Sequence, residues 1–117
     1  MPKLVTIVVP VFNEAENVWL LQEAVQKVFE QLPQYLYQII FVDDGSSDQT
    51  LVALRQMAEQ FPTVRYLSFS RNFGHQFALK AGLDYADGDC VISMDGDMQH
   101  PPELIPAMLE GWEQGND

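Results

Sequence analysis

Two aspartates one residue apart follow an apolar run and could hold a divalent cation. The run ends at Met94, and Asp95, Asp97 and Gln99 come soon after it. Carboxylate and amide oxygens suit Mg²⁺ or Mn²⁺, and the phosphate oxygens of a substrate can complete the coordination shell. The same residues could instead form a polar turn that caps the next helix, because aspartate-rich turns are common.

Other polar side chains follow three further apolar runs. They are Asn13 and Glu14 after residues 4–12, Asp43 and Asp44 after residues 38–42, and Arg71 after residues 64–69. Open α/β sheets bind their ligands at the carboxyl ends of the strands, so we expect these side chains to converge there. Arg71 could neutralise diphosphate oxygens with its planar guanidinium, or it could pair with one of the acidic loops.

The remaining polar candidates are ambiguous. Lys80 is counted among the substrate-binding candidates, although its place within an expected helix also suits a lysine in water. His75 and His100 could line a pocket or support a turn, and spacing alone assigns neither as a base. Cys90 lies in an apolar run, which favours a packed thiol over a nucleophile.

The elements that must position these residues alternate along the chain. Apolar, β-branched runs predict strands at residues 4–12, 38–42, 64–69 and 90–94. Apolar side chains at three- and four-residue steps predict a helix between each pair of strands, and a last helix over residues 102–112. Asn13 is expected to cap the first helix and Ser46 or Ser47 the second. The alternation predicts one α/β domain over residues 1–117, with a parallel sheet and helices on both faces.

Composition excludes several classes of partner. The formal net charge is −11, from 17 acidic and 6 basic residues, which argues against nucleic acid and against simple adhesion to anionic lipid. No stretch approaches the roughly 20 apolar residues of a membrane span. A single cysteine excludes an internal disulfide and favours a reducing compartment.

Several common catalytic and cofactor motifs are missing. Residues 10–14 read PVFNE, where a dinucleotide-binding fold would carry a glycine-rich turn. The sequence also has no Walker lysine loop, no zinc-type spacing of cysteine and histidine, and no nucleophile elbow. These observations argue against NAD binding and against serine-nucleophile hydrolysis.

Four motifs together resemble a known family. They are VPVFNE at 9–14, VDDGSSD at 42–48, SRNFG at 70–74 and MDGDMQHPPE at 94–103. In this order and spacing they resemble the N-terminal, donor-binding part of a family 2 inverting glycosyltransferase with the Rossmann-like GT-A fold. The chain is most similar to the polyprenyl-phosphate branch, which contains dolichol-phosphate mannose synthases and bacterial undecaprenyl-phosphate glycosyltransferases. The resemblance covers essentially all 117 residues.

The resemblance implies a role for each matched position. Pro10, Asn13 and Glu14 would border the base and ribose, Asp44 would contact the nucleoside, Asp43 would support its turn, and Arg71 with residues 72–74 would shape the nucleotide side of the pocket. Asp95 and Asp97, as catalytic residues, and Gln99 would hold Mg²⁺ or Mn²⁺ on the donor diphosphate. Gly96 stands between the two aspartates, where relatives often carry alanine.

The implied activity is transfer of a sugar from a UDP- or GDP-linked donor to a polyprenyl phosphate, with inversion. The family continues with acceptor-side elements, so we expect this chain to bind donor without transferring sugar, and its open sheet edge could allow self-association. The implied location is a cytoplasmic domain at the inner face of the membrane, held through C-terminal segments absent from this chain.

Other functions stay open at this point. The acceptor could be a saccharide in cell-envelope polysaccharide synthesis, or the chain could be a non-catalytic module that binds a nucleotide or a metal. Haloacid-dehalogenase phosphatases also use an Asp-x-Asp motif, with the first aspartate as nucleophile. There the motif follows the first strand of the core, whereas here it follows the fourth.

Overall fold

The computed structural model describes residues 3–94 and 102–115, which form alternating strands and helices. In chain order these are β1 (Lys3–Val11), α1 (Ala15–Glu30), β2 (Tyr35–Asp43), α2 (Thr50–Gln60), β3 (Val64–Ser68), α3 (His75–Tyr85), β4 (Cys90–Ser93), a 3₁₀ turn η1 (Pro102–Leu104) and α4 (Ile105–Glu113). The expected alternation is confirmed. The last helix differs in that its first turn, η1, is wound more tightly.

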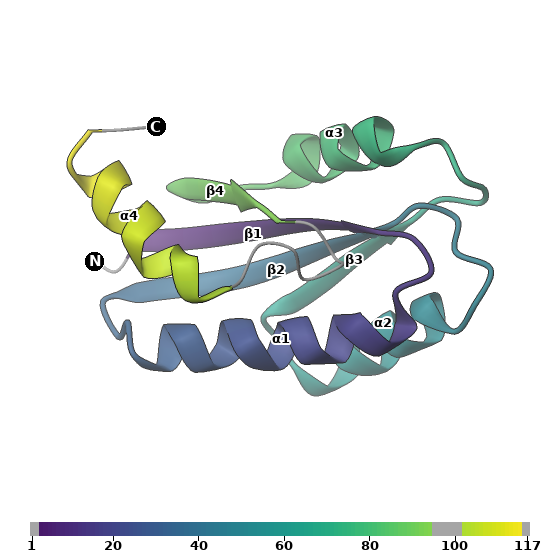
Figure 1. Ribbon diagram of the computed structural model, residues 1–117, viewed down its shortest axis with the longest axis horizontal. Coiled ribbons are helices and arrows are strands. Elements are labelled where there is room, and N and C mark those ends of the chain that lie inside the picture. Colours follow the sequence, from purple (N-terminus) through teal and green to yellow (C-terminus); the bar gives the residue numbers. More distant parts are fainter. Residues whose placement is uncertain (1–2, 95–101, 116–117) are drawn as a thin grey trace.

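The four strands of the described residues make one parallel sheet in the order β3-β2-β1-β4. Val9 pairs with Phe41 and Ile7 with Ile92, so β1 lies between β2 and β4. β1 and β2 are almost entirely buried from their middles to their carboxyl ends, as expected for strands covered on both faces. All four strands therefore direct their carboxyl ends to the same edge of the sheet (Figure 1).

Helices cover the two faces unequally (Figure 1). The larger core cluster joins one face of the sheet to α1, α2 and α4, through residues such as Leu21, Leu54 and Ile105. On the other face, the smaller cluster sets Ala78 of α3 against Ile40 and Val42 of β2. The fold is thus a layered α/β arrangement, and α3 alone covers the second face among the described elements.

Gly82 lets α3 approach the sheet closely. A Cβ atom at this position would lie 2.4 Å from Cγ1 of Val8 and 3.0 Å from Cγ2 of Val42. These distances are shorter than real carbon contacts, so the helix could not keep this position with alanine at residue 82. The approach anchors α3, which begins directly after the loop that leaves β3.

The expected helix caps are wrong for both α1 and α2. Asn13 has a positive φ of 55° and precedes the N-cap residue of α1, Glu14, whose side chain makes no capping hydrogen bond. In α2, Asp48 accepts a hydrogen bond from the backbone N–H of Thr50 at 2.9 Å, in place of Ser46 or Ser47. The residues expected to cap helices instead join one loop to another, as described below.

None of the described helices combines the length and the apolar composition that a membrane span requires.

Candidate functional site

Three loops meet at the carboxyl edge of the sheet and form what we call the carboxyl rim. The rim consists of residues 12–14 after β1, residues 44–49 after β2 and residues 69–74 after β3. All three lie at the right-hand end of the sheet in Figure 1, while α4 lies at the other end. The structure therefore brings the candidate residues of the first three strands to one place, as expected.

The first two loops are joined through Asn13. Its side-chain oxygen accepts a hydrogen bond from the backbone N–H of Ser47 at 2.8 Å, and its own backbone N–H donates to Oγ of Ser46 at 2.9 Å. The positive φ of Asn13 is one that asparagine tolerates better than most residues. Asparagine therefore serves both the backbone geometry and the link between the loops.

Glu14 and Pro10 complete the part of the rim that β1 supplies. The backbone N–H of Glu14 donates to the Thr50 hydroxyl at 3.0 Å, and its carboxylate accepts from Nδ2 of Asn17 at 2.7 Å. Pro10 is buried in β1 opposite Val42. Glu14 is held from two sides, whereas Pro10 contributes to the shape of the strand end from within the sheet.

Asp43 and Asp44 are both buried but have different partners. Asp43 is 1% exposed, and its Oδ1 accepts the backbone N–H of Ser46 at 3.1 Å. Asp44 is 3% exposed, and its carboxylate accepts from the backbone N–H groups of Phe73 at 2.8 Å and Gly74 at 3.0 Å. Asp43 therefore supports its own turn, as expected, whereas Asp44 joins the second loop to the third.

Arg71 extends from the third loop with its guanidinium stacked on an aromatic ring. Its Cζ lies 4.7 Å from the centroid of Phe73, whose ring meets Phe69 edge to face at 5.5 Å. Among the described residues, no carboxylate forms an ion pair with Arg71. The Arg71 side chain is exposed.

Lys80 has a different environment. It lies on α3 and forms an exposed ion pair with Asp84 at 2.8 Å, four residues along the same helix. The contacts in the described part of the chain do not connect Lys80 to the rim. His75, the first residue of α3, follows directly after the third loop.

The expected metal ligands lie outside the described residues. These are Asp95, Asp97 and Gln99, and His100 lies there too. The residue before them, Met94, is buried at the end of β4, and its backbone N–H donates to the carbonyl of Val8 at 2.9 Å. Within residues 3–94 and 102–115, no three histidine, cysteine, aspartate or glutamate side chains are placed to hold a metal ion.

Asp48 is the rim aspartate with a displaced pKa. Partial desolvation raises its pKa, but hydrogen bonds from the Thr50 hydroxyl and the backbone N–H groups of Thr50 and Ala15 outweigh it and hold the pKa below the ordinary value. Its carboxylate caps α2, where negative charge suits the helix dipole. Asp48 is thus a structural carboxylate within the rim.

The sequence interpretation missed several hydrogen bonds at the rim. Ser46, Ser47 and Thr50 receive or donate the hydrogen bonds described above, and Asn72 donates from Nδ2 to the Asp44 carboxylate at 3.1 Å. The position of the two serines close to Asp43 and Asp44 indicated a hydrogen-bonded turn, although both serines were interpreted as helix caps. Nothing in the sequence connects Asn72 with Asp44, because 28 residues separate them.

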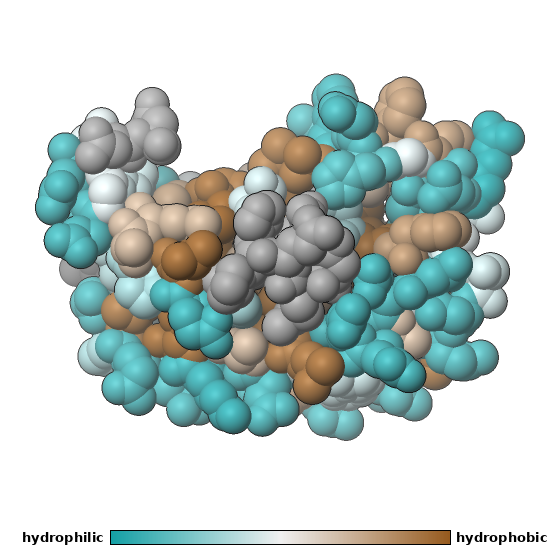
Figure 2. Space-filling view, in the orientation of Figure 1, coloured by the Kyte–Doolittle hydropathy of each residue, from teal (hydrophilic) through white to brown (hydrophobic). Residues whose placement is uncertain are grey.

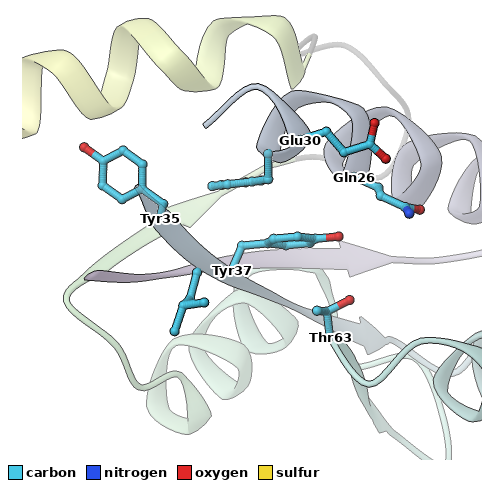
Figure 3. Close-up of a pocket in the computed structure, with 7 residues that line it drawn as sticks. Gln26, Glu30, Tyr35, Tyr37 and Thr63 are labelled. Atoms are coloured by element: carbon cyan, nitrogen blue, oxygen red, sulfur yellow. The ribbon is translucent and has the colours of Figure 1, made fainter. Parts of the chain in front are cut away.

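Several hollows among the described residues lie away from the rim. One, of about 340 Å³, lies at the amino end of β2, where the rings of Phe29 and Tyr37 stack at 4.6 Å. Figure 3 shows Gln26 and Glu30 on one side of the Tyr37 ring and Thr63 on the other. The second lies between β4 and α4, beside Val91 and Trp112, where Figure 2 shows hydrophobic surface. Neither of these two gathers acidic and basic side chains as the rim does, whereas a third hollow, between α1 and η1, is lined by Glu23, Lys27 and Glu103.

Comparisons with known proteins agree on one family. The family model "Glycosyl transferase family 2" matches residues 6–117. The chain is 45% identical over 113 residues to a prophage bactoprenol glucosyl transferase homolog of Escherichia coli, covering 97% of this chain and 37% of that protein. It is 42% identical over 114 residues to a putative glycosyltransferase, CsbB, of Bacillus subtilis, covering 97% of this chain and 34% of that protein. The chain thus spans about a third of the length of the curated relatives it matches.

Solved structures share the fold. A mannosyltransferase from Pyrobaculum calidifontis, in complex with GDP-Man and Mn²⁺, matches with a TM-score of 0.77 and 25% identity, over 96% of this chain and 32% of that one. Staphylococcus aureus TarS in complex with UDP-GlcNAc matches with a TM-score of 0.73 and 20% identity, over 97% of this chain and 32% of that one, which shows the fold alone. The four-stranded parallel sheet is therefore a GT-A-like arrangement.

Proposed function

Because this chain belongs to glycosyl transferase family 2, we propose that its carboxyl rim binds the nucleoside diphosphate of a UDP- or GDP-linked sugar. The whole protein would then transfer that sugar to a polyprenyl phosphate with inversion. The observation that carries the proposal is the convergence of three interlocked loops at the carboxyl edge of a parallel sheet, where folds of this class bind ligands.

The nucleotide would be held by side chains from all three loops. Asn13 and Glu14, with Pro10 shaping the strand end, would border the base and ribose. Asp43 and Asp44, both buried, would complete the site from the second loop. Arg71, exposed and stacked on its own loop, would neutralise diphosphate oxygens. Lys80 stays a candidate from the sequence only.

The diphosphate would be held with a divalent cation by residues after β4. Asp95, Asp97 and Gln99 offer only oxygen ligands at close spacing, which is the donor set that Mg²⁺ and Mn²⁺ prefer. The solved mannosyltransferase is in complex with GDP-Man and Mn²⁺, which supports this assignment. Bound there, the cation would stabilise negative charge on the departing nucleoside diphosphate.

The acceptor is proposed from the relatives. Several of them are named bactoprenol glucosyl transferases, which supports a polyprenyl phosphate as acceptor. A phosphate monoester is largely ionised near neutral pH, so it needs no strong base to attack the anomeric carbon. Positioning the two substrates would then supply much of the rate. The protein would work at the inner face of a membrane, where such a lipid is available.

The test is a donor screen on the protein. Calorimetric titration with UDP, GDP, UDP-glucose and GDP-mannose should show binding of at least one nucleotide, strengthened by Mn²⁺. Incubation of the whole protein with the bound donor and undecaprenyl phosphate should yield a lipid-linked sugar. Absence of nucleotide binding with and without Mn²⁺ would contradict the donor site, whereas binding with transfer only to a saccharide would contradict the proposed acceptor.

A further inference from the structure

The Asp44 carboxylate is already occupied by the protein itself. One of its oxygens accepts the backbone N–H of Phe73 at 2.8 Å, and the other accepts the N–H of Gly74 at 3.0 Å and Nδ2 of Asn72 at 3.1 Å. Hydrogen bonds to a carboxylate are stronger than those between neutral groups. Three donors from one loop therefore converge on one buried side chain of the neighbouring loop.

Further contacts in the backbone reinforce this junction. Nδ2 of Asn72 also lies 3.2 Å from the Asp44 carbonyl, and the backbone N–H of Phe69 donates to the Asp43 carbonyl at 2.9 Å. Gly45, with φ of 72°, lies so close to the third loop that a Cβ atom there would be 2.2 Å from the carbonyl carbon of Arg71. The loop after β3 is thus fixed against the loop after β2 along its length.

The fixed loop carries the exposed cation of the rim. Arg71 stacks on Phe73, the same residue whose N–H is bound by Asp44, so the position of the guanidinium depends on this junction. Gly74, the N-cap of α3, is bound by Asp44 as well, and the helix then packs on the sheet through Gly82. Arg71 is therefore held between a buried carboxylate and a closely packed helix.

We infer that Asp44 is a positioning residue, which acts on donor binding by holding the loop of Arg71 in place. This inference rests on the proposed function, because it concerns binding of a nucleoside diphosphate at the rim. It differs from the direct contact with the nucleoside that the family resemblance implies for Asp44. Two of its three donors are on Oδ2 and one is on Oδ1, so about one of the roughly four acceptor sites of the carboxylate is left for a ligand.

The decisive variant is Gly45→Ala, which leaves the carboxylate in place. Glycine has no side chain to offer a nucleotide, yet alanine at this φ and distance must push residues 71 and 72 away. A positioning role predicts that Gly45→Ala and Asp44→Asn each raise the Kd for the donor nucleotide by about tenfold. A factor of about ten corresponds to the loss of one hydrogen bond between Arg71 and the diphosphate. In an Arg71→Ala background, Gly45→Ala should raise the Kd less than twofold further, because the group being positioned is gone.

A matched control separates positioning from general destabilisation. Gly88→Ala also introduces a close contact at a glycine of positive φ, because a Cβ there would lie 3.0 Å from the carbonyl oxygen of Leu4. Residue 88 lies beside the amino end of β1, away from the rim, so this variant should leave the Kd for the donor within twofold of wild type. Hydrogen exchange at the Phe73 and Gly74 amides, protected in the wild type, should become faster in Asp44→Asn. This readout needs no nucleotide and tests the junction by itself.

The outcomes are distinguishable. A wild-type protein that binds no nucleotide contradicts the proposed donor site, and the inference with it. A wild type that binds donor, with Gly45→Ala binding equally well and Asp44→Asn binding poorly, would show that Asp44 contacts the nucleotide directly. Equal losses in Gly45→Ala and Gly88→Ala would show a general effect of stability, and unchanged exchange at Phe73 and Gly74 in Asp44→Asn would show that the junction does not hold the loop. Each of the last three results would overturn the inference and leave the proposed donor site standing.

Discussion

The side-chain oxygen of Asn13 lies 2.8 Å from the backbone nitrogen of Ser47, so the loops after β1 and β2 are joined by a hydrogen bond across 34 residues of sequence. The same asparagine has a positive φ of 55°. Asn13 therefore supplies two things at the rim, a side-chain hydrogen bond between loops and a backbone conformation with positive φ.

Replacing Asn13 should separate these two contributions. Asn13→Ala removes the hydrogen bond and keeps the unfavourable φ, and we expect it to lower the free energy of unfolding by about 1–3 kcal/mol. Asn13→Gly removes the hydrogen bond but tolerates the φ, so it should cost less. Urea denaturation of both variants measures the difference. Equal losses would mean that the backbone conformation contributes nothing.

Gly82→Ala should destabilise the packing of α3. The new Cβ would meet Val8 and Val42, and overpacking of this kind costs about 1–3 kcal/mol of unfolding free energy. The double variant Val8→Ala/Gly82→Ala makes room for that Cβ, so it should relieve part of the overpacking. Thermal unfolding of the two variants, with Val8→Ala as control, gives the coupling free energy between residues 8 and 82. A Gly82→Ala protein as stable as wild type would contradict the close approach of α3.

Acid should weaken the start of α2 through Asp48. The pKa of this carboxyl is held below its ordinary value of 3.8, so the stabilisation is present above that value and is lost as pH falls through the lower, folded pKa. Asp48→Asn should therefore show a smaller loss of stability than wild type between pH 4 and lower pH. Unfolding followed by circular dichroism across this range is the measurement. Parallel pH profiles for the two proteins would contradict the assignment.

The sequence allowed the order of strands and helices to be predicted because buried strands and amphipathic helices leave local patterns. The Gln38 to Val42 run marked the buried half of β2, but the strand begins at Tyr35, and its first residues are exposed or only half-buried. The helix caps were misplaced because Asn13 and Ser47 bond to each other over a long separation.

The sequence allowed us to predict which loops form the candidate site, but not which residues contact one another within it. Parallel strands bring their carboxyl ends together, so the convergence of Asn13, Asp44 and Arg71 followed from the alternation alone. The occupation of the Asp44 carboxylate by residues 72–74 did not follow, because tertiary packing decides which donors meet a buried acceptor. The metal ligands Asp95, Asp97 and Gln99 lie outside the described residues and stay a prediction.

The measurement that tests the account most directly is calorimetric titration of the donor nucleotide with and without Mn²⁺, in wild type, Asp97→Ala and Asp48→Asn. Wild type should bind UDP or GDP with an affinity that Mn²⁺ raises, since the cation joins the diphosphate to the carboxylates. Asp97→Ala should lose most of that dependence, whereas Asp48→Asn, which alters a helix cap, should retain it. Equal affinity with and without Mn²⁺ in wild type, or an unchanged response in Asp97→Ala, would contradict a metal-assisted donor site at the carboxyl edge of this sheet.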